Sequence, residues 1–228
     1  DSFAELGGQV YFANQDGTNG RELWRSDGTV GGTSLFADLF AGSADSNPEQ
    51  LVATSNSLFF VAETSGTTGD PRQLWTSDGT VGGTSNLTNI TGGFVLKADP
   101  RDLTVVGDQV FFTAYSEANG RDLCVSYGTL LGTFIVVDLS PGNRYTFSLD
   151  DPPVNLGPYS TTFDHFVDLD GTLFFSTRNR LWKSDGTEAG TELVFASDTA
   201  DSAVPMELTV VGATLFFTAS DGRTGREL

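Results

Sequence analysis

A short apolar segment that ends in two aromatic residues recurs along this 228-residue chain. Its copies end at equivalent phenylalanines, namely Phe12, Phe60, Phe112, Phe175 and Phe217. The intervals between successive copies are 48, 52, 63 and 42 residues. Self-similarity at a spacing of roughly 40 to 50 residues is typical of repeat architectures, in which each repeat forms one supersecondary unit.

A second motif follows each of the first four copies. It reads Leu-Trp-x-Ser-Asp-Gly-Thr in three of them, and a second Gly-Thr pair stands four residues further on. The third copy has Cys124 and Tyr127 in place of the Trp and the Asp. Because Asp-Gly pairs favour tight turns, each motif predicts a strand, a turn and another strand.

Each repeat therefore contains four short strands, and the chain is predicted to be an all-β β-propeller of four-stranded antiparallel blades. We expect four complete repeats and a partial fifth in a single domain, 1–228, which could belong to a larger propeller. The approximate blades are 1–40, 50–90, 102–139, 166–197 and 207–228, with an insertion at 140–165. The fifth repeat stops before its Trp, which predicts a chain cut from a longer array.

Two expectations concern the inside of a repeat. Adjacent residues of a strand point to opposite faces, so the aromatic pairs predict that both faces of each blade are buried. The second aromatic of every copy, from Phe12 to Phe217, is expected in the core. Hairpin turns with positive φ are expected at Gly7-Gly8, Ser55-Asn56 and Asp170-Gly171.

The motif Glu-Leu-Trp-x-Ser-Asp-Gly-Thr, preceded by Leu-Phe-Phe-Thr-Ala, resembles the bacterial ELWxxDGT repeat family. The resemblance covers nearly the whole chain, and it departs from the pattern at Cys124 and Tyr127. It implies propeller-like tandem repeats in an exported or cell-surface protein with a binding or structural role. It does not name a ligand.

Several polar and aromatic residues recur with the motif. A residue that is repeated in every blade usually serves the blade, as an Asp bonded to turn N–H groups or an Arg paired with a carboxylate. The Trp residues are interpreted as core between blades rather than as platforms for sugar stacking. The recurring residues are Arg21, Trp24, Asp27, Arg72, Trp75, Asp78, Arg121, Trp182 and Asp185, and Arg226 begins a fifth copy.

The charge of the chain limits its partners. There are 30 acidic and 12 basic residues, a net charge of −18, which disfavours nucleic acid and anionic lipid. A single Cys124 and a single His165 leave no disulfide, cysteine zinc site or histidine cluster. No cofactor is expected, and a weak Ca²⁺ site at Asp168 and Asp170 is less favoured than an Asp-Gly hairpin turn.

The leading hypothesis is a non-enzymatic propeller module that is secreted, at the cell surface or periplasmic. It would offer a binding or assembly surface to a protein partner or to further repeats of the same chain. The alternative is a carbohydrate-binding lectin. A weaker alternative is a glycoside hydrolase that uses the carboxylates of Asp150, Asp151 and Asp164, since paired acids can cleave glycosidic bonds.

Overall fold

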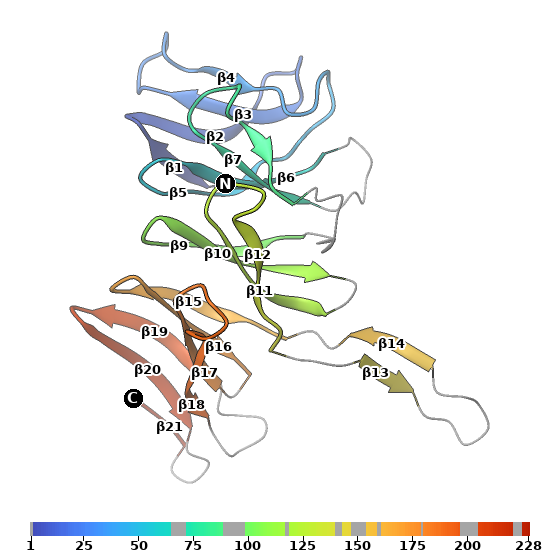
Figure 1. Cartoon of the computed structure of the whole chain (residues 1–228). Coiled ribbons are helices and arrows are strands. Elements are labelled where there is room, and N and C mark those ends of the chain that lie inside the picture. Colours follow the sequence, from blue (N-terminus) through green and yellow to red (C-terminus); the bar gives the residue numbers. More distant parts are fainter. Residues whose placement is uncertain are drawn as a thin grey trace. The chain divides into compact units, whose positions relative to one another are not determined.

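A computed structural model describes most of the chain (Figure 1). The described residues are 2–64, 72–88, 99–116, 119–139, 143–146, 154–158, 161–178, 180–196, 205–220 and 225–228, with backbone only for 143–146 and 154–158. Within these ranges the chain forms strands and turns and no helix, so no helix here could cross a membrane. The prediction of an all-β chain is confirmed.

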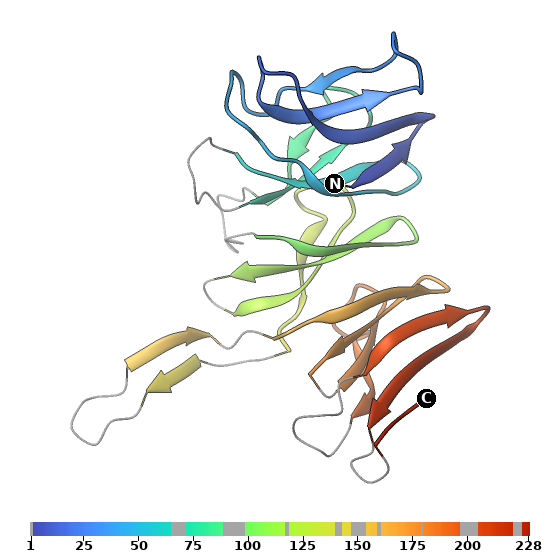
Figure 2. The same ribbon diagram turned by 180° about the vertical axis from the view of Figure 1, so that it is seen from behind.

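Five antiparallel sheets, numbered here 1 to 5 in chain order, follow one another along the described chain (Figures 1 and 2). Sheet 1 consists of β1 (Phe3–Leu6), β2 (Gln9–Gln15), β3 (Arg21–Ser26) and β4 (Ser34–Ala37). Sheet 2 consists of β5 (Glu49–Ala53), β6 (Leu58–Ala62), β7 (Gln73–Ser77) and β8 (Ser85–Asn86). Sheet 3 consists of β9 (Arg101–Val106), β10 (Gln109–Ser116), β11 (Gly120–Ser126) and β12 (Thr133–Val137).

Sheet 4 has the same strand order as sheets 1 to 3, and sheet 5 has three strands. Sheet 4 consists of β15 (Asp164–Leu169), β16 (Thr172–Thr177), β17 (Arg180–Ser184) and β18 (Glu192–Ala196). Sheet 5 consists of β19 (Met206–Val211), β20 (Thr214–Ser220) and β21 (Arg226–Glu227). A separate ribbon of β13 (Asn143–Thr146) and β14 (Val154–Pro158) falls inside the predicted insertion.

The turns between first and second strands show why these hairpins form. Gly7 and Gly8 have φ of 61° and 78°, and Asp170 and Gly171 have 52° and 79°, as a two-residue hairpin turn requires. The expectation of positive φ at Ser55-Asn56 is wrong. That turn is instead closed by a hydrogen bond from the Thr54 N–H to the Ser57 carbonyl, 2.9 Å.

The chain divides into two compact units, 1–116 with 126–134 and 117–125 with 135–228. In the first unit the Tyr11 face of sheet 1 packs against the Phe60 face of sheet 2 in one apolar core. The opposite face of sheet 2 carries Phe59, which lies next to Gly128, and it is buried as well. Both faces of sheet 2 are therefore buried, as the aromatic pair predicts.

The predicted burial of the second aromatic holds for three of the five copies. Phe60, Phe112 and Phe175 are fully buried. The prediction is wrong for Phe12 and Phe217, which are only half-buried. Phe12 lies on the outer face of sheet 1 against Phe3, which is 65% exposed, because no sheet within the described residues of its unit covers this face.

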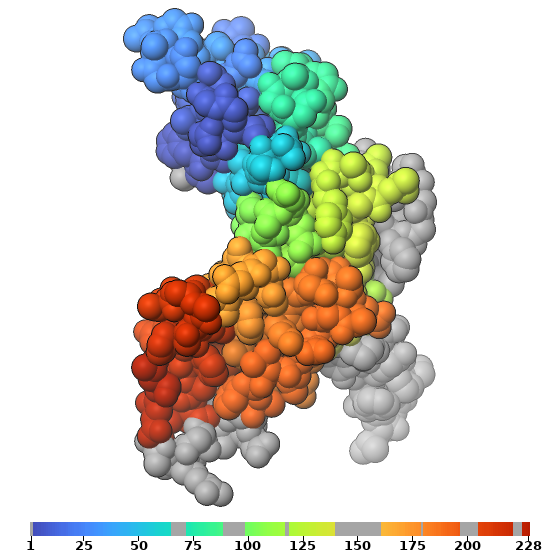
Figure 3. Space-filling model, turned by 60° about the vertical axis from the view of Figure 1, so that its left-hand side comes forward, coloured from blue at the N-terminus to red at the C-terminus, as the bar shows by residue number. Residues whose placement is uncertain are grey.

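Phe217, the other half-buried copy, belongs to sheet 5, which is seen at the molecular surface in Figure 3. One face of this sheet packs on sheet 4, where the Phe217 and Phe195 rings lie 5.8 Å apart. The opposite face exposes 61% of Val211 and 40% of Phe216. Phe217 itself is partly exposed, and β21 pairs with β20 at Ala219 and Ser220.

Candidate functional sites

The Asp-Gly-Thr motif forms a self-contained turn. In all three complete copies the Asp Oδ1 accepts hydrogen bonds from the N–H and the hydroxyl of the Thr two residues later, at 2.6–2.9 Å. These bonds lower the pKa of the carboxyl groups, the Thr hydroxyl first and its N–H second. The aspartates are Asp27, Asp78 and Asp185.

The second Gly-Thr pair completes the same turn. Its Thr hydroxyl lies 2.6–2.8 Å from the motif Ser hydroxyl in all four copies, including the degenerate third one at Ser126 and Thr133. A Cβ at Gly83 would lie 2.1 Å from Asp78 Oδ1, so only glycine fits there. These contacts account for the recurrence of the Asp and of both Gly-Thr pairs.

The recurrent arginines connect each sheet with the segment that follows it. The Arg21 carbonyl accepts hydrogen bonds from the N–H groups of Ser46 and Asn47, at 3.2 and 3.1 Å. The Arg72 carbonyl accepts one from Asp99 at 3.0 Å, and the Arg121 carbonyl accepts one from Thr161 at 3.4 Å. Each contacted segment leads into the first strand of the next sheet, so this contact is common to three repeats.

The residue after each of these arginines is a buried acid or amide, and the sequence analysis did not single it out. Glu22 accepts hydrogen bonds from the Ser46 N–H, the Ser46 hydroxyl and the Leu39 N–H, at 2.9, 2.6 and 2.8 Å. In sheet 2, the Gln73 Oε1 accepts one from the Thr88 hydroxyl at 2.6 Å. Burial raises the pKa of Glu22, and the bonds from Ser46 and Leu39 oppose that rise.

Asp122 occupies the same position in the third repeat, and the Leu139 N–H lies near it as the Leu39 N–H lies near Glu22. Its carboxyl group is fully buried, and neither oxygen makes a hydrogen bond of normal geometry within the described part of the chain. Burial raises its pKa to about 7, the negative charge of Asp138 adds to the rise, and the nearby Leu139 N–H offsets it in part. Asp122 is therefore a buried carboxyl whose protonated form is favoured below about pH 7.

The three tryptophans lie in different surroundings. Trp75 stacks on Phe60 with ring centroids 6.3 Å apart and packs against the core of the first unit. Trp24 pairs with Phe12 on the outer face of sheet 1. Trp182 pairs with Phe175 and donates its Nε1–H to the Thr177 hydroxyl at 2.9 Å. In each case the indole lies opposite the second aromatic of its repeat.

The residues considered for Ca²⁺ lie in a hairpin turn. Asp168 Oδ1 accepts the Gly171 N–H at 2.9 Å, as Glu5 Oε1 accepts the Gly8 N–H at 2.7 Å in sheet 1. Asp170 and Gly171 are the two left-handed residues of that turn. Across the ranges described above, no group of three or more His, Cys, Asp or Glu residues is placed to hold a metal ion.

Two of the acids considered for glycosidase chemistry, Asp150 and Asp151, lie outside the described residues. Asp164 is exposed at the start of β15 and pairs with Ser176.

A bulge with a left-handed residue recurs in the first strand of four sheets, although its residue type differs each time. In sheets 3 and 4 the side chain contacts the residue after the second aromatic: Asp102 accepts from the Thr113 hydroxyl at 3.1 Å, and His165 Nδ1 lies 3.2 Å from the Ser176 hydroxyl. The four left-handed residues, with φ of 51–62°, are Gln50, Asp102, His165 and Glu207. The only histidine thus has a structural contact in its own sheet.

A polar groove of about 410 Å³ opens in the first unit, where β1 and β5 begin. Arg21 and Arg72 come to it from equivalent positions of consecutive repeats, and Arg72 forms an ion pair with Glu49. Both side chains are half-buried, with polar atoms within reach of solvent. The groove is lined by Ser2, Arg21, Asn47, Pro48, Glu49, Gln50 and Arg72.

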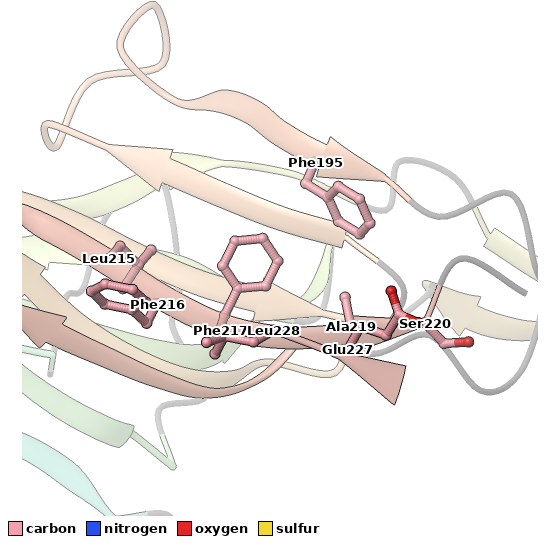
Figure 4. Close-up of a pocket in the computed structure, with 8 residues that line it drawn as sticks. All are labelled: Phe195, Leu215, Phe216, Phe217, Ala219, Ser220, Glu227 and Leu228. Carbon is pink, nitrogen blue, oxygen red and sulfur yellow. The ribbon is translucent and has the colours of Figure 1, made fainter. Parts of the chain in front are cut away.

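An apolar groove of about 370 Å³ lies in the second unit between β18 and β20 (Figure 4). The Phe195 ring faces the Phe217 ring across it, and Leu215 and Ala219 extend the apolar lining along β20. Ser220, Glu227, Leu228 and Phe216 complete the lining. The groove lies beside the edge of β20 that β21 only partly covers.

No protein-family model and no curated protein sequence matches the chain. Among solved structures, TolB from Acinetobacter baumannii is similar with a TM-score of 0.45 and 14% identity, over 98% of this chain and 52% of TolB. A nidogen–laminin complex gives 0.44 and 16%, over 95% and 70% of the two chains. One of two prolyl endopeptidases gives 0.48 and 11%, over 82% and 24%.

The chain thus spans about half the length of TolB. At these TM-scores and identities, none of the similarities assigns a function to the chain.

Proposed function

We propose that the five sheets are blades of a β-propeller, four complete and one partial. The support is that within each unit consecutive sheets pack face to face, with sheet 1 on sheet 2 and sheet 4 on sheet 5. The aromatic pairs direct this stacking, because the first aromatic of one sheet and the second aromatic of the next share a core. Stacked four-stranded sheets in chain order are the construction of a propeller.

We propose further that the chain is a non-enzymatic, exported module that binds protein. The observation that carries this proposal is the polar groove, in which Arg21 and Arg72 of consecutive repeats converge. Arginine is enriched among the residues that dominate protein interfaces, because its planar guanidinium makes several directed hydrogen bonds while its stem packs on apolar surface. Export is supported by the ELWxxDGT resemblance.

The groove can be tested with a phage-displayed random peptide library panned on the immobilised chain. We expect the selected peptides to weaken by at least about tenfold on Arg72→Ala, the scale of one lost interface anchor. The matched control is Arg101→Ala, whose exposed side chain pairs only locally with Asp99. Selected peptides that bind equally well to both variants would refute the groove as the protein site.

A lectin is the second candidate, because the same groove offers amide, carboxylate and guanidinium groups from Asn47, Gln50, Glu49 and Arg72. Such groups can hydrogen-bond sugar hydroxyls. A glycan array separates the two functions, since selective binding of one glycan, lost on Asn47→Ala, would favour the lectin. Turnover of chromogenic glycosides that disappears on Asp151→Asn would instead make the chain a hydrolase.

A further inference from the structure

The turn between β11 and β12, in the third repeat, keeps the internal bonds of the motif. The Ser126 and Thr133 hydroxyls lie 2.8 Å apart, and the Thr133 hydroxyl donates to the Thr129 carbonyl at 2.7 Å. The Gly132 N–H donates to the Thr129 hydroxyl at 3.0 Å. Tyr127 replaces the motif Asp and lies against Gly132, where an added Cβ would be 3.2 Å from the Tyr127 Cβ. The turn therefore has the shape of the other copies although its sequence differs.

The differences fall at four positions of this turn, and each introduces a large apolar side chain. The other three repeats carry Asp at the first position, Val or Glu at the second, Gly or Ala at the third, and Ser or Glu at the fourth. The third repeat carries Tyr127, Leu130, Leu131 and Phe134. Because the same turn forms without these side chains in the other repeats, the fold does not require them.

These four residues, which we call the apolar tip, are exposed together. Leu131 is 99% exposed, and the other three side chains are 43–51% exposed. The Tyr127 and Phe134 rings stack at the two ends of the turn, with centroids 6.3 Å apart, and the two leucines lie between them in the chain. Single exposed apolar residues are ordinary on protein surfaces, whereas a contiguous group marks an interaction site.

The charge and size of the apolar tip indicate what covers it. Residues 125–137 carry no charge, in a chain with a net charge of −18, so the tip suits an uncharged apolar surrounding. Its exposed area is roughly 300–400 Å². One partner in a standard protein interface contributes about 800 Å². A projecting turn of this size is therefore small for a protein interface and fits shallow insertion into lipid.

We propose that the apolar tip inserts into the surface of a lipid bilayer whose headgroups carry no net charge. Leu130 and Leu131 enter the boundary of the hydrocarbon, and Tyr127 and Phe134 lie at the level of the headgroups, where aromatic side chains are favoured. The acidic chain is repelled by anionic lipid, so the binding is selective for zwitterionic lipid. This site is separate from the polar groove and goes beyond the function proposed for it.

The test is co-sedimentation of the 228-residue chain with phosphatidylcholine vesicles. Shallow insertion of a few side chains is reversible and does not exceed the affinity of a single myristoyl chain, about 10⁴ M⁻¹, so we expect half-maximal binding between about 0.1 and 10 mM lipid. Vesicles that also contain phosphatidylglycerol should bind the chain more weakly at low salt, because their charge has the same sign as that of the chain.

Two variants locate the contact. Leu131→Gly introduces the residue that repeats 1 and 2 have at this position, so the turn should still fold, and we expect binding to weaken by at least about tenfold. Val30→Ser is the matched control, because Val30 is 97% exposed in the equivalent turn of sheet 1 but lies outside the apolar tip, and it should leave binding unchanged. Circular dichroism checks that both variants keep their strands.

No binding at about 10 mM phosphatidylcholine, or equal binding of the wild type and Leu131→Gly, would overturn the proposal. Stronger binding to the vesicles with phosphatidylglycerol would also contradict it. Sedimentation velocity of the chain alone tests the protein alternative. If the chain self-associates, Leu131→Gly abolishes this and vesicles do not bind, a second copy covers the apolar tip and the proposal is wrong.

Discussion

Replacing Asp122 by Asn should stabilise the protein at neutral and alkaline pH. Asp122 is fully buried, its oxygens make no normal hydrogen bond in the described chain, and its pKa is raised to about 7 by burial and then by Asp138. Asparagine has almost the same shape and carries no charge. The substitution therefore removes the cost of a buried carboxylate without creating a cavity.

The magnitude follows from linkage between proton binding and folding. Between about pH 4 and pH 7 the unfolded chain ionises this carboxyl whereas the folded chain keeps it protonated, so stability falls as the pH rises and is constant above about pH 7. A pKa that moves from 3.8 to about 7 corresponds to at most about 4 kcal/mol at about 1.4 kcal/mol per unit. We expect Asp122→Asn to gain about 2–4 kcal/mol over the wild type at about pH 8 and less than about 1 kcal/mol at about pH 4.

Urea unfolding followed by circular dichroism at several pH values measures this difference. Because Glu22 also has a raised pKa, the wild type loses stability with pH at more than one site, and only the difference between variant and wild type isolates Asp122. Asp138→Asn is the matched control: it removes the neighbouring charge, lowers the pKa of Asp122 and should give a smaller gain. A gain from Asp122→Asn that is the same at both pH values would refute the reasoning.

Three further predictions concern stability, each measured by urea unfolding. Phe60→Ala should cost about 3–5 kcal/mol because the ring is fully buried, whereas Phe12→Ala, on an outer face, should cost less than half as much. Glu22→Ala should cost about 2–3 kcal/mol, since it removes the carboxylate that accepts from the Leu39 N–H and the Ser46 hydroxyl, and Glu22→Gln should cost less. Gly83→Ala should lower the stability, because its Cβ would clash with the carboxylate of Asp78. In the double variant, Asp78→Ala should recover part of that loss. If the stability losses of the two single variants simply add in the double variant, the clash is contradicted.

The sequence predicts the strands well because two different signals agree in the first four repeats. The aromatic pair marks the second strand of each sheet, and the Ser-Asp-Gly-Thr turn separates the third strand from the fourth. The sequence predicts the burial of the second aromatic less well, because the five copies are equivalent in the repeat pattern. Sheet 2, which carries Phe60, is packed on both faces, whereas within the described residues Phe12 contacts the exposed Phe3 and the sheet of Phe217 pairs with β21 at Ala219 and Ser220.

The sites were harder to predict for a related reason. The two grooves are each formed by residues far apart in the chain, such as Phe195 and Phe217, which no local motif connects. A pattern search also misses positions that repeat in geometry but not in residue type. The partner of the bulge residue, directly after the second aromatic, offered one signal: it is a hydroxyl residue at Thr113, Ser176 and Thr218.

The bulge position shows how a repeat protein can vary chemistry without losing its fold. The left-handed conformation is unfavourable for any residue except glycine, yet Gln50, Asp102, His165 and Glu207 all adopt it. Because cross-strand pairing continues on both sides of the bulge, with a register shift at the bulge itself, the ladder rather than the side chain maintains the conformation. The side chain is thereby free to be an amide, a carboxylate or an imidazole. Gln50, for example, lines the polar groove. Its side-chain amide also donates to the Pro100 carbonyl and accepts from the Leu103 N–H at the start of the next sheet.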